Sequence, residues 1–168
     1  MKNLRWSLMV SMTIWLTAPA WGQAPARLLP DERNTVAVFR QTVLAVVHIN
    51  THQKVLSRFE DITPKSGLGT GFFFDREGHI LTNFHVIENS NQIEVVLNDG
   101  RRLPARLIGT APGLDLAVLS VELAAEQITP LLLGDSDALL IGQKVLAVGH
   151  PLALHNTLTV GIVSSTRR

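Results

Sequence analysis

Apolar and polar positions alternate along the chain in short runs, and most of these runs have the length and composition of β-strands. They are rich in Val, Ile, Leu and Phe, and turns containing Gly, Asn, Asp or Pro separate them. The predicted strands are Val43 to Asn50, Thr70 to Phe74, His79 to Thr82, Gln92 to Leu97, Arg102 to Gly109, Asp115 to Val121, Lys144 to Val148 and Thr157 to Ser164. Closely spaced short strands favour an antiparallel barrel or sandwich, so the predicted fold class is all-β.

One segment before the strands has helical periodicity. Asp31 is placed to cap a short helix through Arg40, with Val36, Phe39 and Val43 spaced along one side. A second segment without strand character, residues 122–133, is predicted to be a connector between two sets of strands.

The first residues have the layout of a secretory signal peptide over residues 1–22. Lys2 and Arg5 precede an apolar run from Trp6 to Leu16, and small residues follow it. A linker over residues 23–33 is predicted next. Because the apolar run is shorter than the roughly 20 residues of a bilayer span, we expect a periplasmic or secreted protein without stable membrane insertion after cleavage. An uncleaved signal that anchors the chain in the membrane is the alternative.

Composition narrows the class of protein. With 46% apolar residues in 168, the chain can bury a core, and a net charge of +1 with 17% charged residues gives no basic surface for nucleic acid. The chain has no cysteine, which excludes disulfides, thiolate metal sites and a cysteine nucleophile.

The segments richest in candidate chemistry surround His85 and Asp115. His85 lies in Thr82-Asn83-Phe84-His85-Val86, after the glycine-rich stretch Gly67-Leu68-Gly69-Thr70-Gly71-Phe72, and Asp115 begins Asp115-Leu116-Ala117-Val118-Leu119. In this order, from about residue 34 to 168, these segments resemble the HtrA/Deg family of trypsin-like serine proteases.

The resemblance implies a chymotrypsin-like double β-barrel with the catalytic groups between the barrels. Residues 34–133 would form the first barrel with its short N-terminal helix, and residues 134–168 would begin the second, truncated one. His85 would be the general base and Asp115 the carboxylate that orients it. We expect the Asp115 carboxylate to be buried, and the glycines at positions 67, 69 and 71 to permit close packing.

The family's third catalytic group, a serine in a Gly-Asn-Ser-Gly-Gly turn, has no match in this sequence. No serine here is followed by two glycines. Ser136 follows Gly134-Asp135, but Asp137 comes next, so a structural turn is expected there. The chain by itself is therefore expected to hydrolyse no peptide bonds. Phe84 and the segment of residues 149–154 differ from the family pattern, which affects the expected shape of the cleft.

The resemblance further implies polypeptide substrates, acyl-enzyme chemistry, no cofactor and assembly into homo-oligomers. None of the six histidines forms a His-Glu-x-x-His motif, so no metal site is predicted. The alternative function is non-catalytic: a fragment or pseudo-protease that binds unfolded protein or a partner through exposed strand edges.

Overall fold

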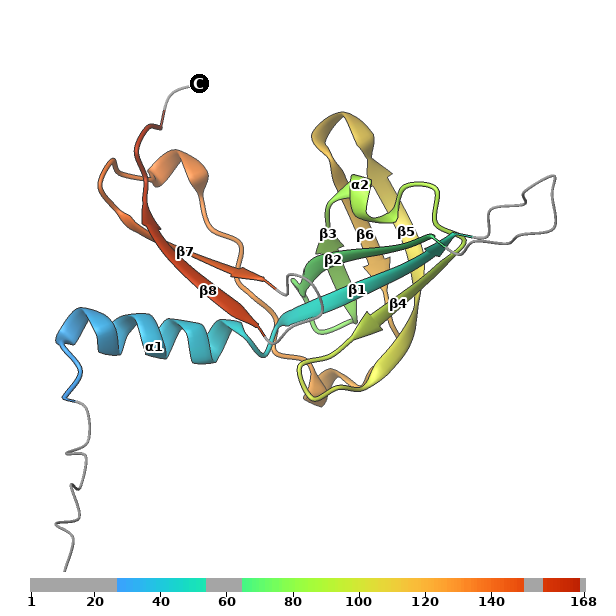
Figure 1. The fold of residues 1–168 in the computed structure, drawn as a ribbon, viewed down its shortest axis with the longest axis horizontal. Coiled ribbons are helices and arrows are strands. Elements are labelled where there is room, and N and C mark those ends of the chain that lie inside the picture. The colour runs from blue at the N-terminus through green and yellow to red at the C-terminus, as the bar shows by residue number, and fades with distance from the viewer. Residues whose placement is uncertain (1–26, 54–64, 150–155, 167–168) are drawn as a thin grey trace, which may run out of the picture.

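The computed structural model describes residues 27–53, 65–149 and 156–166 (Figure 1). Its strands are β1 (Val46–Gln53), β2 (Lys65–Phe73), β3 (His79–Thr82), β4 (Gln92–Val96), β5 (Arg102–Ala111), β6 (Leu116–Ser120), β7 (Lys144–Gly149) and β8 (Thr157–Ile162). The all-β prediction is confirmed, and each predicted strand is present. The largest difference is at β2, which begins at Lys65 and not at the predicted Thr70. The predicted signal peptide lies outside the described residues.

Six of the strands close into an antiparallel barrel. Their order around it is β1-β2-β3-β6-β5-β4, with β1 pairing with both β2 and β4 (Figure 1). In the ladder between β3 and β6, His79 is opposite Ser120 and Thr82 is opposite Ala117. The end of β3 therefore lies beside the beginning of β6.

The barrel interior is the hydrophobic core of the protein. Successive side chains of a strand point to opposite faces, so alternate apolar positions fill the interior. The largest of these fully buried side chains are Val47, Ile49, Ile80, Val95, Leu119 and Ile128. Ile128 comes from the predicted connector, which contains only a short 3-10 turn, η2 (Ala125–Gln127), and no strand. The connector thus closes one side of the core as well as linking the two sheets.

The helix before the barrel begins earlier than predicted. It is α1 (Pro30–Thr42), and the residue at its N-cap is Leu29, whose backbone N–H donates to Oε2 of Glu32 at 2.7 Å. The prediction that Asp31 caps the helix is wrong: Pro30 at the first helical position fixes the start, and Asp31 lies inside the first turn. The helix also begins within residues 23–33, which were predicted to be a linker.

The last two strands form a separate sheet beside α1 and the barrel. β7 and β8 pair antiparallel, with Lys144 opposite Ile162, and β7 contacts both α1 and β1 (Figure 1). Nζ of Lys144 donates to Oγ1 of Thr35 at 3.0 Å, which ties this sheet to the helix. Ser136 lies in the turn η3 (Ser136–Ala138) that leads into the sheet, where Oδ1 of Asp135 accepts the N–H of Asp137 at 2.9 Å. The prediction of a structural turn at Ser136 is confirmed.

No helix in the described part of the chain is long and apolar enough to span a bilayer.

Candidate active site

His85 lies on a short helix immediately after β3. This helix is α2 (Phe84–Ile87), and its Val86 packs against the backbone of β2 at Gly69. A Cβ atom built on Gly69 would lie 2.7 Å from Cγ2 of Val86 and nearer still to its Cγ1, closer than real carbon atoms approach. Glycine at position 69 is therefore what allows α2 to lie flat on the barrel and hold His85 at its rim.

Asp115 occupies a turn at the same rim. It follows the 3-10 turn η1 (Pro112–Leu114) and has a φ of 54°, in the left-handed region that Asp tolerates better than most residues. Because Thr82 and Ala117 are paired, the residues just after β3 and just before β6 meet. Thirty positions apart in the sequence, His85 and Asp115 are brought together by this one ladder.

The two side chains are in direct contact. Nδ1 of His85 lies 2.7 Å from Oδ2 of Asp115, and the backbone N–H of His85 donates to Oδ1 at 2.9 Å. An ionised carboxylate can only accept hydrogen bonds, so Nδ1 carries the proton in this contact. The imidazole is thereby fixed in the tautomer whose Nε2 is free to accept a proton.

Asn83 and Phe84 complete the arrangement. Nδ2 of Asn83 donates to Oδ2 and to the backbone oxygen of Asp115, at 3.1 and 3.2 Å, and the N–H of Phe84 donates to the same backbone oxygen at 3.1 Å. No role for Asn83 was predicted from the sequence, although it lies within the motif around His85. The signal that could have found it was its position, since it is an amide side chain two residues before His85, at the end of a strand. The Phe84 side chain packs against the core, so this departure from the family pattern anchors α2.

The expectation that the Asp115 carboxylate is buried is wrong. Its side chain is 45% exposed, and that of His85 is 67% exposed. The reason is that Asp115 precedes β6 instead of heading it, so its side chain lies in the turn at the rim and does not point into the barrel.

Hydrogen bonds keep this exposed carboxylate ionised. The backbone N–H of His85 is the largest influence that lowers the pKa of Asp115 below its ordinary value, and the His85 side chain is the next. Asp115 is therefore an anion at neutral pH, as an orienting partner for a histidine requires.

The described residues do not pair His85 with a nucleophile. Within residues 27–53, 65–149 and 156–166, no serine hydroxyl is hydrogen bonded to the His85 ring. Most of the segment 149–154, another departure from the family pattern, lies outside the described residues.

Known proteins show what this arrangement resembles. Residues 69–168 match the trypsin-like peptidase domain family. Protease Do-like 1, chloroplastic, from Arabidopsis thaliana is 34% identical over 171 residues, which cover 96% of this chain and 39% of the relative. A probable periplasmic serine endoprotease DegP-like from Marinomonas sp. (strain MWYL1) is 47% identical over 104 residues, which cover 62% of this chain and 22% of the relative.

A solved structure extends the likeness to three dimensions. The HtrA-type protease AlgW with tripeptide superposes with a TM-score of 0.68 at 34% identity, over 78% of this chain and 40% of that one. This chain thus spans less than half the length of each of these relatives. The matched domain family, the relatives and the barrel with its paired histidine and aspartate agree: the chain belongs to the HtrA/Deg family of trypsin-like serine proteases.

Proposed function

We propose that this chain supplies the general base and the orienting acid of a serine endopeptidase, His85 and Asp115 respectively. The observation that carries the proposal is the 2.7 Å contact between Nδ1 of His85 and Oδ2 of Asp115. It leaves Nε2 on the opposite side of an exposed ring, where a proton can be taken from a serine hydroxyl.

The chemistry follows from that geometry. Nε2 of His85 accepts the hydroxyl proton as the serine oxygen attacks the peptide carbonyl, and later returns it to the leaving amine, so that an acyl-enzyme forms. While Nε2 holds the proton, the Asp115 carboxylate stabilises the imidazolium. Asn83 holds that carboxylate in place by a hydrogen bond. Because no serine of this sequence is followed by two glycines, we infer that these 168 residues by themselves hydrolyse no peptide bonds.

The proposed substrates are polypeptides in the periplasm or outside the cell. One relative's name describes a periplasmic serine endoprotease, and the solved structures include HtrA-type proteases holding a tripeptide or a decapeptide. The signal-like segment of residues 1–22 supports export. Assembly of several copies is proposed on the family resemblance alone.

A chimera tests the catalytic roles. Residues 69–168 would replace the matching segment of the Marinomonas relative, and casein turnover would be measured. We expect the chimera to be active, His85→Ala to lower kcat on the order of 10⁶-fold, and Asp115→Asn on the order of 10⁴-fold, the effects of such changes in other serine proteases. Glu126→Gln, which alters an exposed acidic residue of the η2 turn within the exchanged segment, is the matched control and should leave turnover unchanged. An active His85→Ala chimera would refute the assignment.

A fluorophosphonate probe tests the inactivity of the chain alone. The probe reacts with activated serines, so the purified chain should remain unlabelled. Labelling at any serine would show that a nucleophile is present and that the inference from the missing Ser-Gly-Gly is wrong.

A second candidate function is binding through the sheet of β7 and β8. In the described part of the chain these strands pair only with each other, so each has a free edge. Val160 and Ile162 on β8 are more than half exposed. Free edges and apolar side chains together favour addition of a strand from a partner or an unfolded protein. Cross-linking of the inactive chain to an unfolded polypeptide would distinguish this function from proteolysis.

A further inference from the structure

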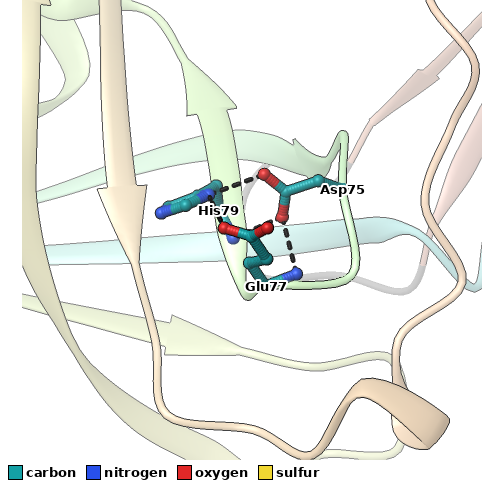
Figure 2. Close-up of side chains that lie close together, drawn as sticks. All are labelled: Asp75, Glu77 and His79. Atoms are coloured by element: carbon teal, nitrogen blue, oxygen red, sulfur yellow. Dashed lines mark hydrogen bonds and ion pairs between the residues drawn. The ribbon is translucent and has the colours of Figure 1, made fainter.

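A second cluster of chemically active side chains lies at the turn between β2 and β3. Asp75, Glu77 and His79 each offer one donor atom, and the three atoms all lie within 4.8 Å of one another. Figure 2 shows the two carboxylates and the imidazole converging at this turn. The cluster is separate from the proposed catalytic pair, because His79 begins β3 and His85 follows the end of that strand. Three strand steps of about 3.3 Å put roughly 10 Å between the two ends.

The separations suit a small metal ion. Nδ1 of His79 lies 2.6 Å from Oδ2 of Asp75 and 4.0 Å from Oε2 of Glu77. In a tetrahedral site with bonds of about 2.0–2.1 Å to nitrogen and oxygen, ligand atoms are about 3.3 Å apart. The separation between His79 and Asp75 is shorter than this, and the separation between His79 and Glu77 is longer. Glu77 is 81% exposed, so its side chain can swing inward without disturbing the core.

Backbone hydrogen bonds within the turn orient the Asp75 side chain. Its Oδ1 accepts the N–H groups of Glu77 and His79, at 2.8 and 3.2 Å, which leaves Oδ2 facing the imidazole. One carboxylate ligand is thus oriented toward the imidazole in advance.

We propose that Asp75, Glu77 and His79 bind a divalent first-row transition-metal ion such as Zn²⁺. The ligand atoms would be Oδ2 of Asp75, a carboxylate oxygen of Glu77 and Nδ1 of His79. The imidazole nitrogen favours zinc and its neighbours over Ca²⁺ and Mg²⁺, which prefer oxygen ligands. The ion takes the place of the proton on Nδ1, and that proton is exchanged through solvent so that the neutral bound ring carries its one proton on Nε2.

The fourth position of the ion would face solvent. The His79 and Asp75 side chains are 29% and 30% exposed, and Glu77 is more exposed still. A water molecule or a donor from another molecule would complete the coordination. The three ligands follow one another at every second residue, which no common zinc motif does, so a search for such motifs finds nothing here.

Zinc titration of the purified chain, free of any affinity tag, tests the proposal. Isothermal titration calorimetry with ZnCl₂ would be run on the unaltered chain, His79→Asn and Glu77→Gln. We expect saturable binding that weakens at least about 10-fold in each variant, because each loses one of three ligands. His52→Asn and Glu126→Gln, which alter an exposed histidine and an exposed glutamate elsewhere, are the matched controls and should bind zinc as the unaltered chain does.

Glu77→Gln separates a metal ligand from a residue that only stabilises the turn. The His79–Asp75 contact and the backbone bonds to Asp75 survive this change, so folding monitored by circular dichroism should be unaltered. The proposal is overturned if Glu77→Gln binds zinc as tightly as the unaltered chain, if the His52→Asn control loses as much affinity as His79→Asn, or if the unaltered chain shows no saturable zinc binding.

Discussion

Replacement of Gly69 by alanine tests how α2 is held on the barrel. The added methyl group would lie 2.7 Å from Cγ2 of Val86 and 3.1 Å from its Cβ, and nearer still to Cγ1. Rotation of the Val86 side chain cannot relieve the contact with its Cβ, so the helix that carries His85 must move. Overpacking of this kind costs about 1–3 kcal/mol.

Urea unfolding of the purified chain measures this cost. With a slope of about 1–3 kcal/mol/M for a small protein, a loss of about 2 kcal/mol lowers the midpoint by roughly 1 M. Gly134→Ala is the matched control, because nothing lies within 4 Å of its added carbon and its φ is not positive. That substitution should leave stability unchanged or raise it by up to about 1 kcal/mol, through the stiffer unfolded chain.

A double substitution identifies the contact responsible. If Val86 is the obstacle, Gly69→Ala combined with Val86→Ala should be more stable than the sum of the two single changes predicts, by about 0.5–3 kcal/mol. Two results would refute the reasoning. One is a Gly69→Ala chain as stable as the unaltered one, and the other is strict additivity in the double variant.

Three further changes have predictable effects on unfolding. Ile128→Ala should cost about 2–5 kcal/mol in urea unfolding, since the side chain is 2% exposed; a loss below 1 kcal/mol would mean that the connector is not part of the core. Thr82→Val should cost about 0.5–1.5 kcal/mol, because its buried hydroxyl donates to a β2 carbonyl at 2.9 Å; chemical denaturation of the isosteric variant measures it. Glu94→Gln tests pH dependence: the hydrogen bond from Asn50 is the largest influence that lowers the pKa of Glu94 below its ordinary value of 4.5. Its stabilisation is therefore present above about pH 4.5 and lost as pH falls through the lower folded value, so the variant should be less stable by about 0.2–1 kcal/mol at pH 7 and equal in strong acid.

The strands could be predicted from sequence because their pattern is local. His79 to Thr82 agrees with the structure at both ends, since a turn and an asparagine border an alternating segment. The first residue of α1 could not be predicted in this way. Pro30 and Asp31 are both residues that occur at the start of a helix, and which of them begins it depends on the backbone conformation before the helix. The burial of Ile128 could not be predicted from the sequence either, because a connector packs against the core only once the barrel has closed.

The two candidate residues could be proposed from the sequence, but their surroundings could not. His85 and Asp115 were proposed by resemblance, and their contact depends on strand pairing that no local pattern reports. The exposure of Asp115 was misjudged because a residue beside an apolar strand looks the same in sequence whether it lies inside the strand or in the turn before it. The cluster at Asp75 and His79 was missed because its contacts form only within the folded turn.

The pairing of β3 with β6 explains how two exposed side chains can hold a defined geometry. If β6 slipped by one residue, Asp115 would move about 3.3 Å along the strand, and every β6 side chain would change face. Leu119, which is fully buried, would then point to solvent, at a cost of about 1.5–3 kcal/mol for that side chain alone. The core therefore fixes the register, and the register fixes the distance between His85 and Asp115. Hydrogen bonds at the rim then need only select the rotamers of His85 and Asp115, which is why two side chains this exposed can hold a fixed contact.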